Sequence, residues 1–229
     1  MSKTVARFPG VSRRNVWRLG GAALAGYLLG ATPTADLVAN GMARQTSSDR
    51  PDLRSTGSGN PGAANVTKLF GGPAGAAVFA GDAGKALIAC RVALRFAGPA
   101  GAHIAGTAAV VGHCYPVWNG FRGGKGVAAS AGQMLGTFPA YLPIDLAIGV
   151  AITRTERWKD RPTESTALIC ALWVALASVW WRRDLPNLWA PRATGGLPLA
   201  AAASSAVIVR KFIVQPDVTR ADTQRDRSQ

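Results

Sequence analysis

The chain has 229 residues, of which 48% are hydrophobic and only 17% charged, and its 26 Lys and Arg against 12 acids give a net charge of +14. The charged fraction is below the roughly 25% of a soluble globular domain, and the apolar content excludes an intrinsically disordered chain. The three cysteines form no CxxC pair, which excludes a disulfide scaffold and a zinc site built on paired cysteines.

Long uncharged runs separate the basic residues along the chain. These runs cover residues 19–35, 96–121, 126–144, 165–181 and 193–209. A nucleic-acid-binding protein would instead cluster its basic residues on polar helices or strands, so no nucleic-acid partner is expected. A membrane-crossing helix needs about 20 mostly apolar residues, and several runs approach that length. We therefore predict an all-α polytopic membrane bundle of five to seven transmembrane helices, about seven; an alanine-rich soluble protein is the alternative.

The first predicted element is an apolar helix that follows a basic N-terminal extension, residues 1–18. The pair Arg13 and Arg14 resembles a twin-arginine export signal. Residues 31–35 form a poor cleavage site, however, so a first transmembrane helix is the favoured interpretation.

A polar loop is predicted over residues 40–72, followed by an apolar stretch, 73–111, that is long enough for two membrane passes. Two passes return the chain to the side that it left. The loop at 112–126 is therefore expected to face the same compartment as the first loop.

The remaining spans are shorter or interrupted. Residues 127–153 contain two prolines and one Asp, so they predict either one tilted span or a hairpin of two short helices. Spans are also predicted at 165–181 and 195–209. The membrane-embedded domain is assigned to residues 19–212, and the polar tail at 213–229 is expected to be disordered.

Charge gives an expected orientation for the bundle. The loops at 40–72, 112–126 and 154–163 are basic, and the positive-inside rule places such loops in the cytoplasm. All three are cytoplasmic if 127–153 is a hairpin. The basic N-terminus then lies outside, against the same rule.

A glycine-rich segment lies in the first loop and reads Gly57-Ser-Gly-Asn-Pro-Gly-Ala-Ala-Asn65. It fits the G-x-G-x-x-G pattern of a dinucleotide site, but the residues before it do not form a buried strand, which that fold requires. Three polar side chains stand among glycines whose backbone N–H groups can approach a ligand, and Lys68 follows. We predict an anion-binding loop; a flexible turn is the alternative.

A second glycine-rich segment places Lys125 among Gly123, Gly124 and Gly126. Glycines free the backbone to surround an oxyanion, and a helix that starts next to them adds its positive N-terminal end. The segment is not a Walker A loop, because Asn119 replaces its first glycine and Gly126 replaces its Ser or Thr. Phosphate binding and a plain basic loop at the membrane edge both fit this segment alone.

His113 lies just upstream of the second segment and is a candidate general base. The pair Asp82 and Lys85, at i and i+3, predicts an ion pair within an apolar stretch, where ionisable residues are usually paired. No second His stands at metal-ligand spacing, and neither a His-x4-Asp motif nor a G-x-S-x-G elbow occurs. Neither a metal nor a cofactor is therefore expected.

These segments together resemble a known family. The runs 57–68, 112–117 and 121–128, with Asp82 and Lys85, are similar to the bacterial acyl-phosphate:glycerol-3-phosphate acyltransferases of the PlsY type, over about residues 20–155. The resemblance implies a seven-helix enzyme of the bacterial inner membrane with its motif loops facing the cytoplasm. It implies transfer of a fatty acyl group from acyl phosphate to glycerol 3-phosphate, giving lysophosphatidate for phospholipid biosynthesis, among membrane lipids and without a metal or cofactor.

The resemblance and the residue chemistry assign roles in three groups. The candidate catalytic residues are Ser58, His113 and Lys125. The candidate substrate- and phosphate-binding residues are Gly59, Asn60, Gly62, Asn65, Lys68, Gly123, Gly124 and Gly126. The supporting residues are Asp82 and Lys85.

This chain departs from the family pattern at several positions. Ala64 and Ala129 stand where the family has Thr. Lys68 stands where the family has Arg, so an ammonium replaces a planar guanidinium that could bind phosphate with two hydrogen bonds. The serine-rich segment expected after Arg154 and the C-terminal His-x-x-Asn-x-x-Arg segment are absent. A degenerate, non-catalytic family member is therefore one alternative. A membrane transporter of a phosphorylated solute, which glycine-rich broken helices near the membrane midplane would suit, is the other.

Overall fold

The computed structural model describes residues 13–45, 51–158 and 160–215. Within these ranges the chain forms α-helices, one short 3-10 helix and no strand. The elements are α1 (Arg13–Gly30), α2 (Thr34–Gln45), α3 (Ala63–Phe70), α4 (Gly72–Cys114), the 3-10 helix η1 (Val117–Asn119), α5 (Val127–Thr137), α6 (Leu142–Arg154), α7 (Pro162–Arg183) and α8 (Gly196–Val214).

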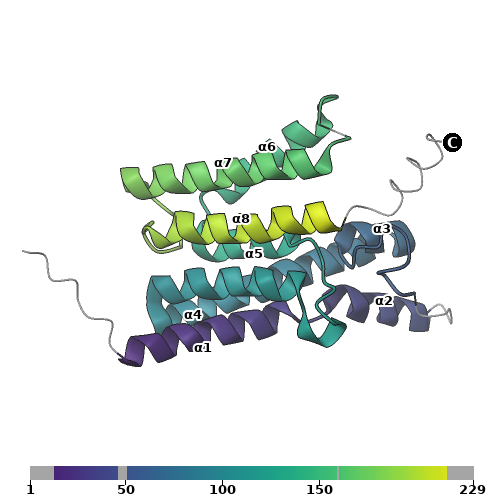
Figure 1. The fold of residues 1–229 in the computed structure, drawn as a ribbon, viewed down its shortest axis with the longest axis horizontal. Coiled ribbons are helices and arrows are strands. Elements are labelled where there is room, and N and C mark those ends of the chain that lie inside the picture. Colours follow the sequence, from purple (N-terminus) through teal and green to yellow (C-terminus); the bar gives the residue numbers. More distant parts are fainter. Residues whose placement is uncertain (1–12, 46–50, 159, 216–229) are drawn as a thin grey trace, which may run out of the picture.

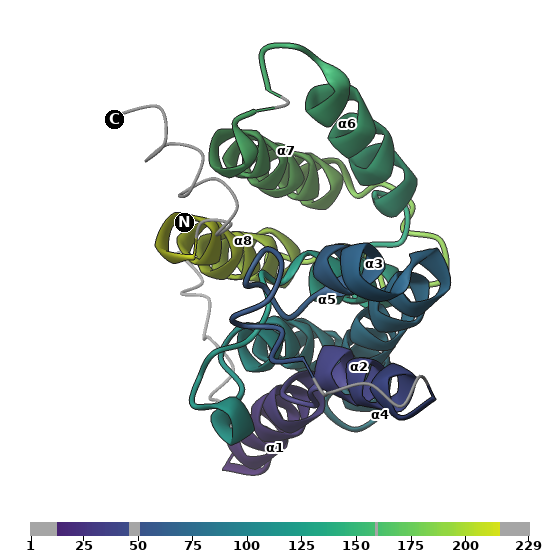
Figure 2. The same ribbon diagram turned by 90° about the vertical axis from the view of Figure 1, so that its right-hand side faces the viewer.

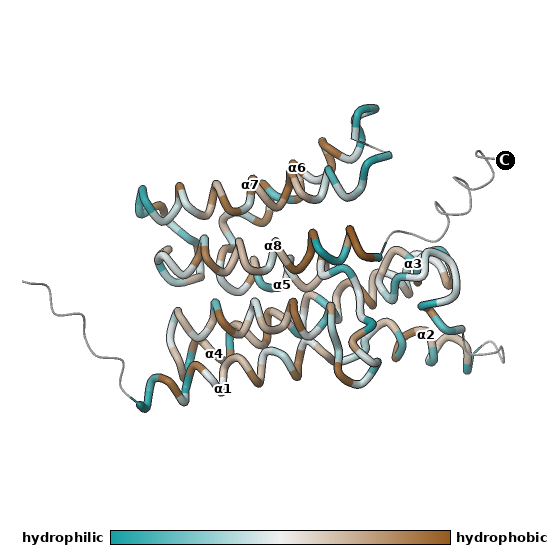
Figure 3. The backbone as a smooth tube through the Cα atoms, viewed as in Figure 1, coloured by the Kyte–Doolittle hydropathy of each residue, from teal (hydrophilic) through white to brown (hydrophobic). Residues whose placement is uncertain are grey.

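The longer helices lie side by side, as Figure 1 shows, and form one bundle. Apolar positions run along the helices, and hydrophilic positions gather toward the two ends of the bundle (Figure 3). Three helical stretches of the described chain are long and apolar enough to cross a membrane unaided: Arg13–Gln45, α7 and α8. The predicted all-α membrane bundle is confirmed, while the number of membrane crossings stays a prediction.

The stretch predicted to make two passes is one long element, α4, that is broken in the middle. Gly98 has φ 70° and ψ −167°, a backbone conformation that side-chain-bearing residues rarely adopt, and Pro99 follows it. The arms before and after Gly98 run antiparallel: a Cβ on Gly106 would lie 2.7 Å from the Cys90 sulfur, and His113 lies 3.3 Å from Asp82, farther from the break on both arms. Both ends of α4 therefore lie at the same end of the bundle.

The segment 127–153 is a hairpin of two short helices, one of the two arrangements that the sequence left open. At 1.5 Å per residue, α5 is about 16 Å long and α6 about 20 Å, both shorter than the roughly 30 Å bilayer core. Phe138 and Tyr141, both buried in the connection, stack with their ring centroids 5.2 Å apart. This hairpin returns the chain to the end of the bundle at which α5 begins.

The predicted polar loop at 40–72 holds more regular structure than expected. It contains the last residues of α2 and the whole of α3, which buries Asn65 and Val66. Val66 packs with Leu53 and Val78, so a small apolar cluster fixes this helix against α4. Sequence alone gave no sign of α3, because its eight residues are too few for a clear helical pattern.

Two predicted boundaries fall at the ends of the chain. α1 begins at Arg13, inside the predicted basic extension 1–18, and α8 ends at Val214, just inside the predicted tail 213–229. Residues 1–12 and 216–229 lie outside the described residues, so the expected disorder of the tail stays a prediction. The assignment of the membrane-embedded domain to residues 19–212 also stays a prediction.

Small residues bring α1 into contact with the second arm of α4. Gly26 and Gly30, four residues apart on one face of α1, face Ala105 and Ala109 of α4. A Cβ on Gly30 would lie 2.1 Å from the Ala109 carbonyl oxygen. Close backbone approach through small residues is a common way to pack helices in membranes, so α1 belongs to the bundle.

We predict that Gly30→Ala destabilises the protein by about 1–3 kcal/mol, because the added methyl group overpacks this contact. Gly21→Ala in the same helix is the matched control, since no heavy atom lies within 4 Å of a Cβ at that position. Denaturant unfolding in detergent micelles measures both variants. Equal stability of the two variants would contradict the described packing of α1 on α4.

Candidate active site

The two glycine-rich segments lie at the same end of the bundle, which Figure 2 views along the helices. A cavity of about 340 Å³ opens between them. It is lined by predicted site residues and by others, namely Ser58, Asn60, Gly62, Ala63, Ala64, Lys68, Phe79, Asp82, His113, Lys125, Gly126, Val127, Ala128 and Phe212. The fold therefore brings the two motifs, which are far apart in sequence, to one cavity.

The first glycine-rich segment is shaped by the side chain of Asn65. Its Oδ1 accepts a hydrogen bond from the Ser58 N–H at 2.9 Å, and its Nδ2 donates to the carbonyls of Leu53 and Thr56. Gly57 has φ 64°, and a Cβ there would lie 2.2 Å from Asn65 Oδ1. Asn65 is fully buried and does not line the cavity, so its amide holds the loop in shape.

Other residues of the first segment face the cavity. Ser58 is buried and Lys68 exposed, and both line it together with Asn60. The Asn60 Oδ1 has no hydrogen-bond partner among the described residues. Gly59 does not line the cavity; its carbonyl accepts a hydrogen bond from Gln215 Nε2 at 3.1 Å, just beyond α8.

The second segment lies directly against the end of α4. The N–H groups of Gly123 and Gly124 donate to the carbonyls of Cys114 and His113. Lys125 is buried beside the cavity, and Gly126 caps the N-terminus of α5. The positive end of the α5 dipole and the Lys125 ammonium thus lie at one place, as the sequence predicted.

α8, the last helix of the described residues, completes the cavity. The sequence did not predict this contribution. Phe212 of α8 lines the cavity, and the Lys125 ammonium lies 4.6 Å from the centre of its ring, a cation–π contact. Phe79 of α4 adds a second aromatic side chain to the wall. The sequence does contain a sign that this helix ends near the loops: the basic pair Arg210 and Lys211 is typical of a helix end at a membrane surface.

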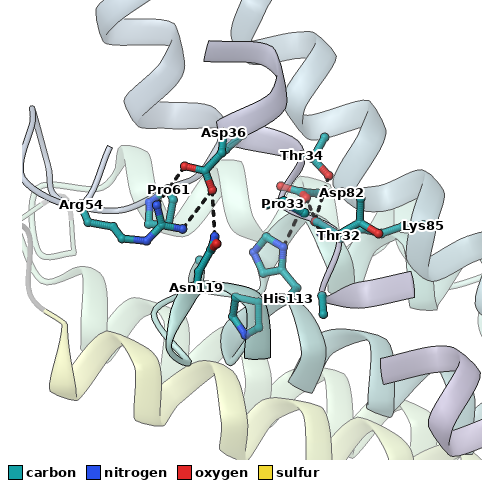
Figure 4. A pocket seen from close by; sticks show the side chains of 15 residues that line it. Thr32, Pro33, Thr34, Asp36, Arg54, Pro61, Asp82, Lys85, His113 and Asn119 are labelled. Atoms are coloured by element: carbon teal, nitrogen blue, oxygen red, sulfur yellow. Dashed lines mark hydrogen bonds and ion pairs between the residues drawn. The ribbon is translucent and has the colours of Figure 1, made fainter. Parts of the chain in front are cut away.

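A buried group of three charged or titratable side chains lies beside the cavity (Figure 4). The Asp82 carboxylate lies 2.8 Å from Lys85 Nζ and 3.3 Å from His113 Nδ1, and Asp82 is only 2% exposed. Lys85 also donates to the Thr32 carbonyl between α1 and α2, at 2.8 Å. The predicted ion pair of Asp82 and Lys85 is present, and it includes a third partner, His113, that the sequence did not indicate.

The contact with Asp82 fixes the orientation of the imidazole. When Nδ1–H donates to the carboxylate, Nε2 is the nitrogen that accepts a proton, and it points away from Asp82. His113 lines the 340 Å³ cavity as well as a much smaller one of about 20 Å³, which Gly123 and Gly124 also line. A His–Asp pair at a cavity is the arrangement of a general base and the group that orients it.

A second charged contact joins the two loops on the other side of the small cavity. Asp36 of α2 receives two hydrogen bonds from the Arg54 guanidinium, at 2.9 and 3.0 Å, and one from Asn119 Nδ2 at 3.0 Å. The hydrogen bond with Asp36 raises the pKa of Arg54 above its ordinary value, and burial opposes this. None of these three residues was a sequence candidate for the site.

No metal-binding group stands out in this cavity. Among the residues that the structure describes, His, Cys, Asp and Glu nowhere gather in a set of three or more that could hold a metal ion. The cavity instead offers the ammonium groups of Lys68 and Lys125 and the hydroxyl of Ser58, which are ligands for oxyanions.

The fold and the cavity define a class: a helical membrane protein whose two basic, glycine-rich loops meet a buried His–Asp pair. Comparisons with known proteins agree with it. A family model described as glycerol-3-phosphate acyltransferase matches residues 20–217. This chain therefore belongs to the glycerol-3-phosphate acyltransferase family. The match includes the C-terminal third, where the sequence analysis found no family segment.

Individual relatives carry the same description. Glycerol-3-phosphate acyltransferase 1 of Rhizobium johnstonii is 38% identical over 155 residues, which are 67% of this chain and 72% of the relative. The acyltransferase of Maricaulis maris is 40% identical over 162 residues, 71% of this chain and 70% of its own. The crystal structure of PlsY (YgiH), an integral membrane glycerol 3-phosphate acyltransferase in its glycerol 3-phosphate form, has a TM-score of 0.70 at 26% identity. That match covers 90% of this chain and 93% of PlsY.

We predict that Asp82→Leu destabilises the protein by about 3–5 kcal/mol, because it leaves the buried Lys85 ammonium without its carboxylate. The double variant Asp82→Leu/Lys85→Leu removes both charges and should recover much of this loss. Denaturant unfolding in detergent compares the three proteins. A double variant less stable than Asp82→Leu would contradict the ion pair.

Proposed function

We propose that the protein transfers a fatty acyl group from an acyl phosphate to glycerol 3-phosphate, giving lysophosphatidate for phospholipid synthesis. The observation that carries the proposal is the single cavity that both glycine-rich segments and His113 line. The reaction requires two phosphate groups to be held close together, and each segment suits one of them. Membership of the family supports the acceptor, since PlsY has been crystallised in a glycerol 3-phosphate form.

Each phosphate has a set of donors in this proposal. Lys125, with the backbone around Gly126 at the start of α5, binds one phosphate through charge, N–H groups and the helix dipole. Ser58, Asn60 and Lys68 bind the other across the cavity. Phe79, Val127 and Phe212 give the same cavity an apolar wall, where the start of the acyl chain would lie.

The chemistry needs no enzyme nucleophile, because an acyl phosphate is already activated. The acceptor hydroxyl oxygen attacks the carbonyl carbon, His113 Nε2 takes the hydroxyl proton, and the carbon–oxygen bond to phosphate breaks. Phosphate leaves with the electron pair of that bond, and Lys125 stabilises its charge. Asp82 keeps the imidazole in the tautomer that accepts a proton. The rate enhancement thus comes from positioning and electrostatics.

We also place the protein in a bacterial inner membrane with the cavity at the cytoplasmic face. The loops that form the cavity and the connection between α6 and α7 are all basic, as the positive-inside rule requires of cytoplasmic loops. Lipids then surround the bundle, and the water-soluble substrate reaches the cavity from the cytoplasm.

The direct test is phosphate release by purified protein given an acyl phosphate and glycerol 3-phosphate, with lysophosphatidate identified in the lipid extract. Appearance of both products in equal amounts supports the proposal. Folded protein that binds glycerol 3-phosphate but forms no lysophosphatidate would favour the non-catalytic alternative. Uptake of glycerol 3-phosphate into vesicles without acyl transfer would favour the transporter.

We predict that Lys125→Ala lowers kcat/KM by about tenfold to a hundredfold, because a charged hydrogen bond to phosphate is worth roughly 1.5–3 kcal/mol. Arg122→Ala is the matched control, since it removes an equal charge from the same loop but its side chain is exposed and does not line the cavity. Steady-state kinetics of both variants gives the comparison. Equal kinetics for Lys125→Ala and wild type would remove Lys125 from the site.

Lys68 is exposed at the cavity wall on α3, so its predicted contribution is smaller. Lys68→Ala should raise the KM for glycerol 3-phosphate by several-fold, about tenfold at most, because solvent screens an exposed charge. Lys68→Arg should leave this KM unchanged or lower it, since a guanidinium can bind phosphate with two hydrogen bonds. Titration of glycerol 3-phosphate against the three proteins checks this. If Lys68→Ala keeps the wild-type KM, Lys68 is a basic residue of the membrane edge only.

A further inference from the structure

We propose that Asp36 is a positioning residue that sets the distance between the two phosphate-binding loops. It does so by holding Arg54 of the first loop and Asn119 of the second on one carboxylate. Its effect on catalysis rests on the proposed function, whereas its effect on loop geometry does not.

The first half of the contact is a bidentate ion pair. Arg54 Nη1 and Nη2 donate to Asp36 Oδ1 and Oδ2 at 2.9 and 3.0 Å, as Figure 4 shows. The two side chains are only 13% and 18% exposed, so solvent competes weakly for them. Parallel N–H···O bonds between a guanidinium and a carboxylate fix both distance and orientation.

The second half of the contact reaches the other loop. Asn119 Nδ2 donates to Asp36 Oδ2 at 3.0 Å, and Arg54 Nε donates to the Arg122 carbonyl at 2.8 Å. Arg54 thus bonds both to Asp36 and directly to the backbone that leads into the Lys125 segment. One carboxylate and one guanidinium therefore connect the loop that carries Ser58 with the loop that carries Lys125.

Each loop is fixed to its own helix by other bonds. Asn65 holds the first loop to α3, and the N–H groups of Gly123 and Gly124 hold the second to α4. These bonds fix the shape of each loop but not the spacing between them. Asp36 and Arg54 do not line the 340 Å³ cavity; they line the small cavity beside His113 and another between α2 and the first loop. Their proposed contribution is therefore to the geometry of the loops. A misplacement of about 1 Å can cost a hundredfold in rate when catalysis depends on positioning.

The test exchanges Asp36 and Asn119. Asp36→Asn removes the carboxylate, and Asn119→Asp places a second carboxylate beside the first, so each single variant should lower kcat/KM by about tenfold to a hundredfold. The double variant Asp36→Asn/Asn119→Asp restores one carboxylate next to Arg54 and should regain most of the activity.

Asp52→Asn is the matched control. It removes a carboxylate that lies 3.9 Å from Arg54 Nη1 but is 58% exposed, and it should keep wild-type kcat/KM within about twofold, as expected for a weak exposed ion pair. Wild-type kinetics in both Asp36→Asn and Asn119→Asp would overturn the proposal, as would failure of the double variant to exceed either single variant.

A second measurement does not depend on activity. Spin labels at Ser55 and Trp118, in a protein whose three native cysteines are replaced, report the distance between the loops. Asp36→Asn should broaden this distance distribution, and Asp52→Asn should not. An unchanged distribution in Asp36→Asn would overturn the proposal even if activity fell. If the wild type itself transfers no acyl group, the proposed function fails, and the distance measurement still decides the role of Asp36.

Discussion

A carboxylate buried between two membrane helices is the constraint on which the site depends. Asp82 is in an environment where an isolated charge is very costly, so it must have partners close at hand. Lys85 supplies one from the same helix turn, and His113 supplies the other from the opposite arm of α4. The break at Gly98 allows the two arms of α4 to fold back on each other, so that Asp82 and His113 come into contact. The cost of burying Asp82 therefore determines how the α4 hairpin closes and where the imidazole lies.

The same group links the site to the rest of the bundle. Lys85 donates to the carbonyl of Thr32, in the short connection between α1 and α2, and α2 in turn presents Asp36 to both loops. The second glycine-rich loop rests on the backbone next to His113. His113, the loop that carries Lys125 and the start of α2 are thus all held at one end of α4. For a reaction that relies on positioning, a shared reference point matters more than the strength of any single bond.

Sequence predicted the features that depend on local composition. The helical class, an apolar stretch within 73–111 long enough to fold back on itself, and the two glycine-rich segments follow from apolar runs and glycine content. The hairpin at 127–153 was one of two arrangements that its prolines and Asp145 allowed. The roles of individual residues within the glycine-rich segments were harder to predict from sequence. The motif predicts Asn65 as a binding residue, yet its side-chain amide makes all three of its hydrogen bonds to the backbone of the loop.

Contacts between distant segments were beyond the reach of sequence for a physical reason. Asp82 meets His113 only because α4 folds back on itself, and Asp36 meets Asn119 although 83 positions separate them. Neither pair has a characteristic spacing, because each depends on how the intervening chain folds back and not on a local sequence pattern. Phe212 was missed because the family segment expected near it is absent, and an aromatic residue at a helix end normally reads as an interface anchor.

The position of α8 along the chain has a consequence for when the cavity forms during synthesis. Phe212 lies against Lys125, and Gln215, just after α8, donates to the carbonyl of Gly59, so the C-terminal end of α8 and the residue after it contact both loops. α8 follows both glycine-rich segments along the chain, so it is synthesised after them. A chain that is still being made has both glycine-rich segments but lacks the wall that holds its buried lysine. The cavity is therefore completed only after α8 has been synthesised and has packed against the two loops.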